Sequence, residues 1–182
     1  MRKHFEIEVR WTAFPLHPDT PEEGLTLEEL FAGRPVDIDK IMLRLKQVAD
    51  ELGLPLGERK KTYNSRLAQE LAKWAESKEK GDLFHEAVFR AYFVDGKNIG
   101  KIDELVALAQ SIGLPEKEAR SVLESRTFKE AVDADWSRSH ALGVTAVPTF
   151  VFRDQAMVGA QPYEVLEQFL KTCGLRERKK SD

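Results

Sequence analysis

The spacing of apolar residues changes twice along this chain, and these changes limit the folds it can adopt. Over residues 5–11 apolar and charged residues alternate, which predicts a β-strand with one buried face. Over 39–125 apolar residues recur every three or four positions, which predicts a compact block of amphipathic helices. Over 144–152 β-branched and aromatic residues favour a strand again. An α/β fold with a large helical insertion satisfies this pattern.

Local signals place the remaining elements. Thr26, followed three residues later by Glu29, predicts a capping box at the start of a short helix. A further helix is predicted over 128–142, a hairpin over 144–159, and a last helix that opens at Pro162. The order strand, helical block, helix, strand, strand, helix is that of a thioredoxin fold with a helical insertion, in which one more strand and helix come first.

Composition excludes several kinds of site. Cys173 is the only cysteine among the 182 residues, so they cannot form a disulfide, a thiolate zinc cluster or a CxxC pair among themselves. The four histidines show no metal-ligand spacing. A formal net charge of -3 with interspersed signs argues against a nucleic-acid or membrane-surface partner. No apolar run approaches the roughly 18 residues of a membrane span, nor does the start look like a signal peptide, so we expect a cytoplasmic protein without metal or cofactor.

Six segments carry a resemblance to a known family. They are 143–152 (GVTAVPTFVF), 158–162 (VGAQP), 14–18 (FPLHP), 62–65 (TYNS), 89–93 (FRAYF) and 113–115 (GLP). Together they resemble the FrnE-like branch of the DsbA oxidoreductases over about residues 5–172. The related 2-hydroxychromene-2-carboxylate isomerases and kappa-class glutathione transferases are similar in architecture.

The resemblance implies a division of the chain into four parts. Residues 1–38 form a strand and connector of the thioredoxin-like part, and 39–125 form the helical insertion domain. Residues 126–174 complete the thioredoxin-like part with a helix, two strands and a helix, and 175–182 form a polar tail.

The resemblance also implies a substrate-binding loop at Val147, Pro148 and Thr149. In the family the matching proline is cis and lies opposite the redox cysteines, so the Val147 backbone is free to pair with a bound peptide or thiol ligand. Local sequence alone favours a trans proline at the start of an edge strand, because only about one X-Pro bond in twenty is cis. The implied partner is a thiol- or disulfide-containing protein, or glutathione.

Several polar residues have open roles. Asn64 matches an asparagine that helps to bind glutathione in the related transferases, and a helix N-cap explains it equally well. Asp133, Asp135 and His140 could pair near the loop that leads to Pro148, and a solvated helix face accounts for them as well. Asp135 shares a face of the 128–142 helix with Trp136.

One family element is missing from the sequence. Family members begin with a strand and a CxxC loop at a helix N-terminus, which lowers the thiol pKa. Only four residues precede Phe5 here, so we expect a truncated, redox-inert chain. The missing strand lies between 5–11 and 149–152 in the family and would leave both with an unpaired edge. Three outcomes follow: a longer gene, a strand supplied by another chain, or closure of the two strands. Exposed edges also favour a homo-oligomer.

Three functions are consistent with this reading. The first is a FrnE-like thiol–disulfide oxidoreductase, whose missing loop would carry CxxC. The second is a glutathione-dependent isomerase or transferase, whose loop would carry serine. The third is a non-catalytic module that binds peptide without any thiol.

Overall fold

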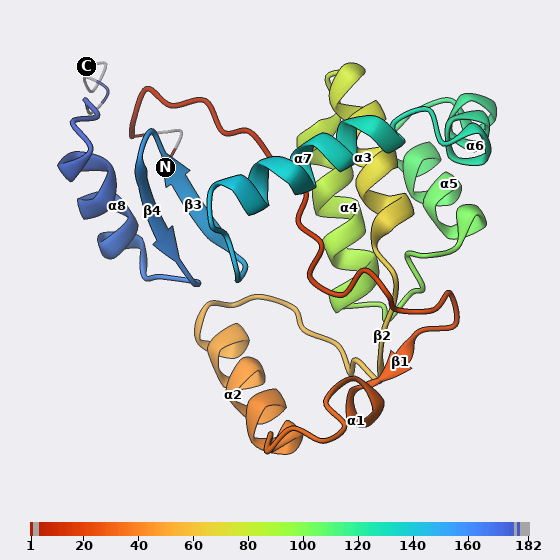
Figure 1. The fold of residues 1–182 in the computed structure, drawn as a ribbon, viewed down its shortest axis with the longest axis horizontal. Helices are drawn as coiled ribbons and strands as arrows, with labels where there is room; N and C mark the ends of the chain where they lie inside the picture. The colour runs from red at the N-terminus through yellow and green to blue at the C-terminus, as the bar shows by residue number, and fades with distance from the viewer. Residues whose placement is uncertain (2–3, 177, 179–182) are drawn as a thin grey trace. The chain divides into compact units, whose positions relative to one another are not determined.

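The structure is a computed structural model that describes residues 1, 4–176 and 178 (Figure 1). Its internal contacts divide the chain into two compact units, Met1–Leu16 with Ala134–Asp182, and His17–Asp133. The domain boundaries predicted after residues 38 and 125 both fall inside the second unit. Of the predicted polar tail, residues 177 and 179–182 lie outside the described residues.

The second unit is built on four packed helices. They are α3 (Arg66–Ser77), α4 (Gly81–Phe93), α5 (Ile102–Ser111) and α6 (Glu116–Ser125). Their apolar stripes meet in one core, in which Leu71, Phe84 and Leu105 have no exposed surface. The predicted helical periodicity is therefore confirmed for these four elements.

A short entry segment and one further helix complete this unit. The segment comprises β1 (Leu25–Thr26), α1 (Leu27–Leu30) and β2 (Lys61–Thr62), with β1 antiparallel to β2. The predicted capping box is confirmed: Thr26 N donates to Glu29 Oε2 at 2.7 Å, and Glu29 N donates to Thr26 Oγ1 at 3.1 Å. The β1–β2 pair was not predicted, because strands of two residues carry no readable periodicity.

Helix α2 (Ile38–Glu51) differs from the expectation of one compact helical block. None of its residues belongs to the core formed by α3 to α6. Figure 1 shows it apart from those helices within the same unit, beyond the β1–β2 pair. Its amphipathic pattern predicted the helix correctly but did not determine what covers the apolar face.

A buried carboxylate ties α3 to the end of α6. Glu70 is fully buried and accepts hydrogen bonds from Arg66 Nε at 2.6 Å and from Arg126 Nε and Nη2, both at 2.7 Å. Burial alone would raise the pKa of Glu70, but the hydrogen bonds from Arg126 and Arg66 hold it below its ordinary value. Charge-assisted pairing of this kind allows a carboxylate to be buried.

The first unit contains the predicted hairpin and last helix. They are β3 (Thr149–Phe152), β4 (Gln155–Val158) and α8 (Tyr163–Thr172). β3 and β4 pair antiparallel across a two-residue turn, which confirms the hairpin. Figure 1 shows that α8, which follows β4 in the chain, lies next to β4. Arg178 lies beside the N-terminal segment in this unit, since its backbone N–H donates to the His4 carbonyl at 2.7 Å.

The alternating segment at the start does not form the predicted strand. Phe5 is buried and takes part in one β-bridge, but the described residues 6–13 belong to no strand. Val9 and Trp11 are 42% and 41% exposed. A strand is defined by ladder hydrogen bonds to a neighbouring strand, and among the described residues no strand is paired with 6–13.

Candidate functional site

The candidate loop begins at the end of α7 (Lys129–Ala141). Gly143 adopts a left-handed conformation, φ +67°, which a residue with a side chain adopts only at a cost. Val144 N donates back to the Ser139 carbonyl at 3.0 Å and closes the turn. This glycine C-cap directs residues 144–148 away from the helix and toward β3.

The loop leaves the backbone of Val147 free. The Val147–Pro148 peptide bond is cis, and Val147 is 45% exposed. Thr149 Oγ1 donates to the Ala146 carbonyl at 2.6 Å. This hydrogen bond links the residue before the Val147–Pro148 dipeptide to the residue after it. No described residue is hydrogen-bonded to the Val147 N–H or C=O.

The register of the hairpin identifies a second set of free groups. Gly159 N donates to the Pro148 carbonyl at 2.7 Å, so Pro148 faces β4. In an antiparallel ladder the facing direction alternates, and the second and fourth residues of β3 therefore also pair with β4. Thr149 and Val151 direct their N–H and C=O groups to the opposite edge, where no described strand lies.

Apolar side chains of the hairpin and of α8 are also uncovered. Phe150 and Val151 on β3 are each 40% exposed, Val158 on β4 is 54% exposed, and Val165 on α8 is 43% exposed. In α8 no residue is buried. Residues of this type on a short hairpin normally face a core, so this part of the unit offers an apolar surface beside unpaired backbone groups.

Helix α7 anchors the N-terminal segment of the same unit. The Asp135 carboxylate is 3% exposed and accepts a hydrogen bond from Ala13 N at 3.0 Å and one from Arg10 Nη2 at 3.4 Å. Ser139 Oγ donates to the Ala13 carbonyl at 3.2 Å. The role of Asp135 stayed open in the sequence, although its position on the apolar face beside Trp136 indicates a buried polar anchor.

Asn64 serves the architecture of the helical unit. Its Nδ2 donates to the carbonyls of Pro18 at 3.0 Å and Thr20 at 2.8 Å, and its Oδ1 accepts from Arg66 N at 2.9 Å at the start of α3. Both amide hydrogens and the oxygen are thus used within the chain. Its role in glutathione binding stays a prediction, as do the substrate-binding roles of the residues at 147–149.

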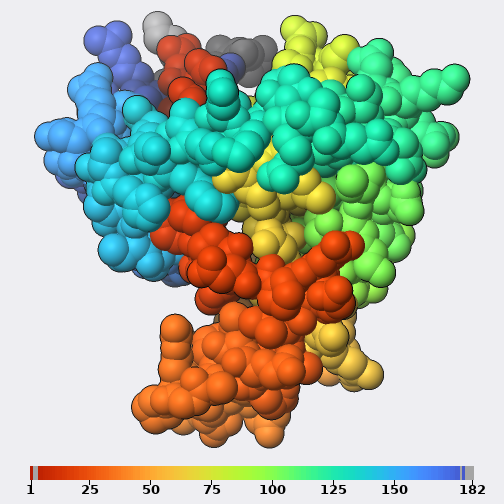
Figure 2. Space-filling model, turned by 45° about the vertical axis from the view of Figure 1, so that its right-hand side comes forward, coloured from red at the N-terminus to blue at the C-terminus, as the bar shows by residue number. Residues whose placement is uncertain are grey.

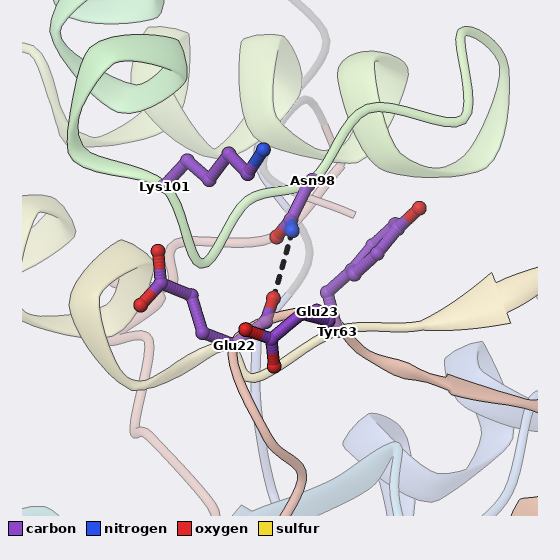
Figure 3. Close-up of a pocket in the computed structure, with 5 residues that line it drawn as sticks. All are labelled: Glu22, Glu23, Tyr63, Asn98 and Lys101. Atoms are coloured by element: carbon purple, nitrogen blue, oxygen red, sulfur yellow. Dashed lines mark hydrogen bonds between the residues drawn. The ribbon is translucent and has the colours of Figure 1, made fainter.

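A hollow of about 340 Å³ lies elsewhere in the helical unit (Figure 3). It is lined by Glu22, Glu23, Tyr63, Asn98 and Lys101. Asn98 Nδ2 donates to the Glu22 carbonyl at 2.8 Å across one side of it. None of the predicted site residues lines this hollow.

Two kinds of feature are absent from the described residues. No group of three or more His, Cys, Asp or Glu side chains is arranged to hold a metal ion there. In the same part of the chain no helix has both the length and the apolar character needed to cross a membrane.

Comparison with known families decides the relationship. The family described as the DSBA-like thioredoxin domain matches residues 1–171. The chain belongs to this family. The predicted resemblance to DsbA proteins is therefore confirmed, and so is the thioredoxin-like α/β fold.

Three relatives show how far the similarity of this DSBA-like chain extends. A probable DsbA oxidoreductase of Streptomyces coelicolor is 26% identical, with a TM-score of 0.81 over 94% of this chain and 77% of that one. YwbO of Bacillus subtilis is 28% identical over 166 residues, which are 90% of this chain and 80% of YwbO. A 2-hydroxychromene-2-carboxylate isomerase shares the fold at 21% identity, with a TM-score of 0.64 over 75% of this chain and 66% of its own.

Proposed function

We propose that this chain is the substrate-holding part of a FrnE-like, DsbA-type thiol–disulfide oxidoreductase. The observation that carries the proposal is the free backbone of Val147, continued by the free edge of β3 at Thr149 and Val151. An extended peptide can form main-chain hydrogen bonds to such a row of groups, as peptides do at other exposed sheet edges. The comparison with the Streptomyces coelicolor protein supports the same class of function.

The chemistry requires thiols that these residues do not contain as a pair. In thiol–disulfide exchange a thiolate attacks one sulfur of a disulfide, the other sulfur leaves as a thiolate, and a second thiol resolves the mixed disulfide. Cys173 is a single cysteine and cannot complete this cycle. The reactive pair is therefore supplied by a segment outside these 182 residues, and we expect them alone to give no dithiol-dependent reduction of insulin.

The apolar surface beside the edge supports the same arrangement. A strand that pairs with Thr149 and Val151 would also cover part of the exposed side chains of Phe150 and Val151, which lie on opposite faces of the hairpin. We propose that in a molecule that also contains the strand leading to the redox thiols, this strand pairs with Thr149 and Val151 while the substrate pairs with Val147, and that without this strand a peptide can occupy the whole edge. A cytoplasmic location is part of the proposal, and the name of one structural neighbour, the cytosolic disulfide reductase DsbM of Pseudomonas aeruginosa, is consistent with it.

Glutathione is the second candidate ligand. The structure of DsbM was determined with glutathione, and its fold matches this chain with a TM-score of 0.55. Glutathione contains a peptide backbone around a cysteine, so it could pair with Val147 in the same way as a protein substrate. This candidate predicts a glutathione-dependent isomerase or transferase. A module that only binds peptide is the third possibility.

Amide hydrogen exchange, followed residue by residue by NMR, tests the proposal. The ligands are an extended peptide whose cysteine is blocked as a mixed disulfide, and glutathione disulfide. We expect the peptide to slow exchange at Val147, Thr149 and Val151. Phe150 and Phe152 serve as internal controls, since their amides pair with β4 with or without ligand.

A pair of variants connects binding to the shape of the loop. Thr149→Ala removes the hydrogen bond to Ala146 and should weaken peptide binding about three- to tenfold, the effect of one hydrogen bond. Thr145→Ala, an exposed threonine in the same loop, should leave binding unchanged. Protection by glutathione alone would favour the second candidate, and no protection by either ligand would contradict a binding role for this edge.

A further inference from the structure

Helix α2 carries an apolar stripe that the described chain does not cover. Ile41, Leu45, Val48 and Leu52 are between 43% and 66% exposed. Their spacing of four, three and four residues places them on one face of the helix. Figure 2 shows the residues of α2 (orange) below the packed helices of the same unit (yellow to green).

The stripe is not the side on which α2 rests against its own unit. Ala49 is the only buried residue of α2, at 9% exposure, and Met42 is half-buried. Both lie on the flank of the stripe. In heptad notation the stripe occupies positions a and d, while Met42 and Ala49 occupy position e. The side chains at positions a and d therefore remain exposed in the folded chain.

The other flank of the stripe carries two opposite charges one heptad apart. Arg44 and Glu51 both occupy position g, and both are exposed. Neither forms an ion pair with a described residue. Charges at g positions select the partner and the orientation of paired helices.

We propose that α2 pairs antiparallel with α2 of a second copy of this chain. A two-fold axis between residues 46 and 47 places Ile41 opposite Leu52 of the second copy, and Leu45 opposite Val48. The same axis brings Arg44 of each copy next to Glu51 of the other, which gives two equivalent ion pairs. An interface of this kind is self-complementary, as a two-fold dimer requires.

The charges distinguish this arrangement from a parallel one. In a parallel pair, position g of one helix lies next to position e of the other. Arg44 would then face Ala49, and no ion pair would form. Only the antiparallel register both buries the apolar stripe and pairs Arg44 with Glu51.

Sedimentation equilibrium of the whole chain tests the proposal. We expect the wild type to be a dimer that dissociates on dilution. Leu45→Glu places a charge at the centre of the stripe and should weaken dimerisation more than about a hundredfold, because it removes apolar burial from both copies. Leu45 is exposed in the single chain, so circular dichroism should show unchanged helix content.

Charge exchange tests the register. Arg44→Glu should weaken dimerisation about tenfold, because each of the two ion pairs across the interface is replaced by two neighbouring carboxylates that repel each other. The double variant Arg44→Glu with Glu51→Arg should restore the affinity of the wild type. Lys46→Glu makes the same change in net charge outside the interface and should have little effect.

Two results would overturn the proposal. A wild type that is monomeric at all concentrations would show that copies do not pair, including the case in which α2 is covered by another protein. A dimer that survives Leu45→Glu, or is not restored by the charge exchange, would show association through a different surface, such as the β3 edge. Neither result bears on peptide binding at Val147.

Discussion

Asn64 has all of its amide groups engaged by the chain, so its replacement should be felt as a loss of stability. Asn64→Ala removes the acceptor for Arg66 N and both donors to the preceding loop. We expect the free energy of unfolding to fall by about 1 to 2 kcal/mol, because three hydrogen bonds are lost that each contribute about 0.5 to 1.5 kcal/mol at most. Urea denaturation measures this change. Gln110→Ala, at an exposed amide on α5, is the control, and equal stability of both variants would show that the hydrogen bonds of Asn64 do not support the fold.

The fold buries the charge of Glu70 beside two arginines. The side chain of Glu70 is 1% exposed, and those of Arg66 and Arg126 are 14% and 42% exposed. Removing one member of a buried ion pair leaves its partners uncompensated, so Glu70→Ala should lower the free energy of unfolding by about 3 kcal/mol. Glu124→Ala removes an exposed carboxylate from α6 and should change it by less than about 0.5 kcal/mol.

The same carboxylate makes stability depend on pH. The pKa of Glu70 is lower in the folded chain than its ordinary value of 4.5, so folding favours the charged form. Its contribution is fully present above that ordinary value and is lost as the pH falls through the lower folded pKa. The difference in stability between the wild type and Glu70→Gln should therefore be constant near neutral pH and should shrink below about pH 4.5. Chemical denaturation at several pH values measures it, and a difference that persists in acid would contradict the assignment.

Among the elements, α7 has a role that extends beyond its own packing. Its Asp135 and Ser139 hold the backbone of Ala13, in a segment that no described strand pairs. Asp135→Ala leaves the partly buried Ala13 N–H without this partner, which costs on the order of 1 kcal/mol. We expect trypsin to cleave after Arg10 faster in this variant.

The conservative change separates charge from hydrogen bonding at this position. Asp135→Asn keeps an acceptor for Ala13 N and should retain most of the resistance to trypsin. Asp154→Ala, in the exposed turn between β3 and β4, should cleave like the wild type. Unchanged cleavage of Asp135→Ala would show that the segment is held by other contacts.

Taken as a whole, the molecule has an uneven core. The contiguous buried cluster lies in α3 to α6 and the residues between them, whereas α8 contains no buried residue. Amides protected by a dense core open only with large free energies, so α3, α4 and α5 should exchange slowest. We expect exchange in α8 and the β3–β4 hairpin to be at least about tenfold faster by mass spectrometry. Equal protection of α3 and α8 would contradict this expectation.

Core substitutions check the same point by another route. Leu71→Ala should lower the free energy of unfolding by about 2 to 5 kcal/mol, because Leu71 has no exposed surface and its truncation leaves a cavity. Val165→Ala on α8 should change it by less than about 1 kcal/mol, since Val165 is 43% exposed.

Sequence patterns were reliable where a local physical rule decides the outcome. The capping box at Thr26 and Glu29, the β3–β4 hairpin and the helix breaks at glycine follow from hydrogen bonds and backbone preferences within a few residues. The loop at 143–149 was identified because its segment resembles the family, not because of its periodicity. Its free backbone groups could be established only from the register of the hairpin.

Residues 6–11 and helix α2 show where this reliability ends. An alternating or 3.6-residue pattern states that one face of an element is apolar, because the pattern follows from the geometry of the strand or the helix itself. Whether that face is covered depends on a neighbour that can be distant in the sequence or belong to another molecule. The amino acids alone therefore specified which elements can form, while the folded arrangement decided that α3 to α6 share a core and that β3 and α2 each keep an uncovered side.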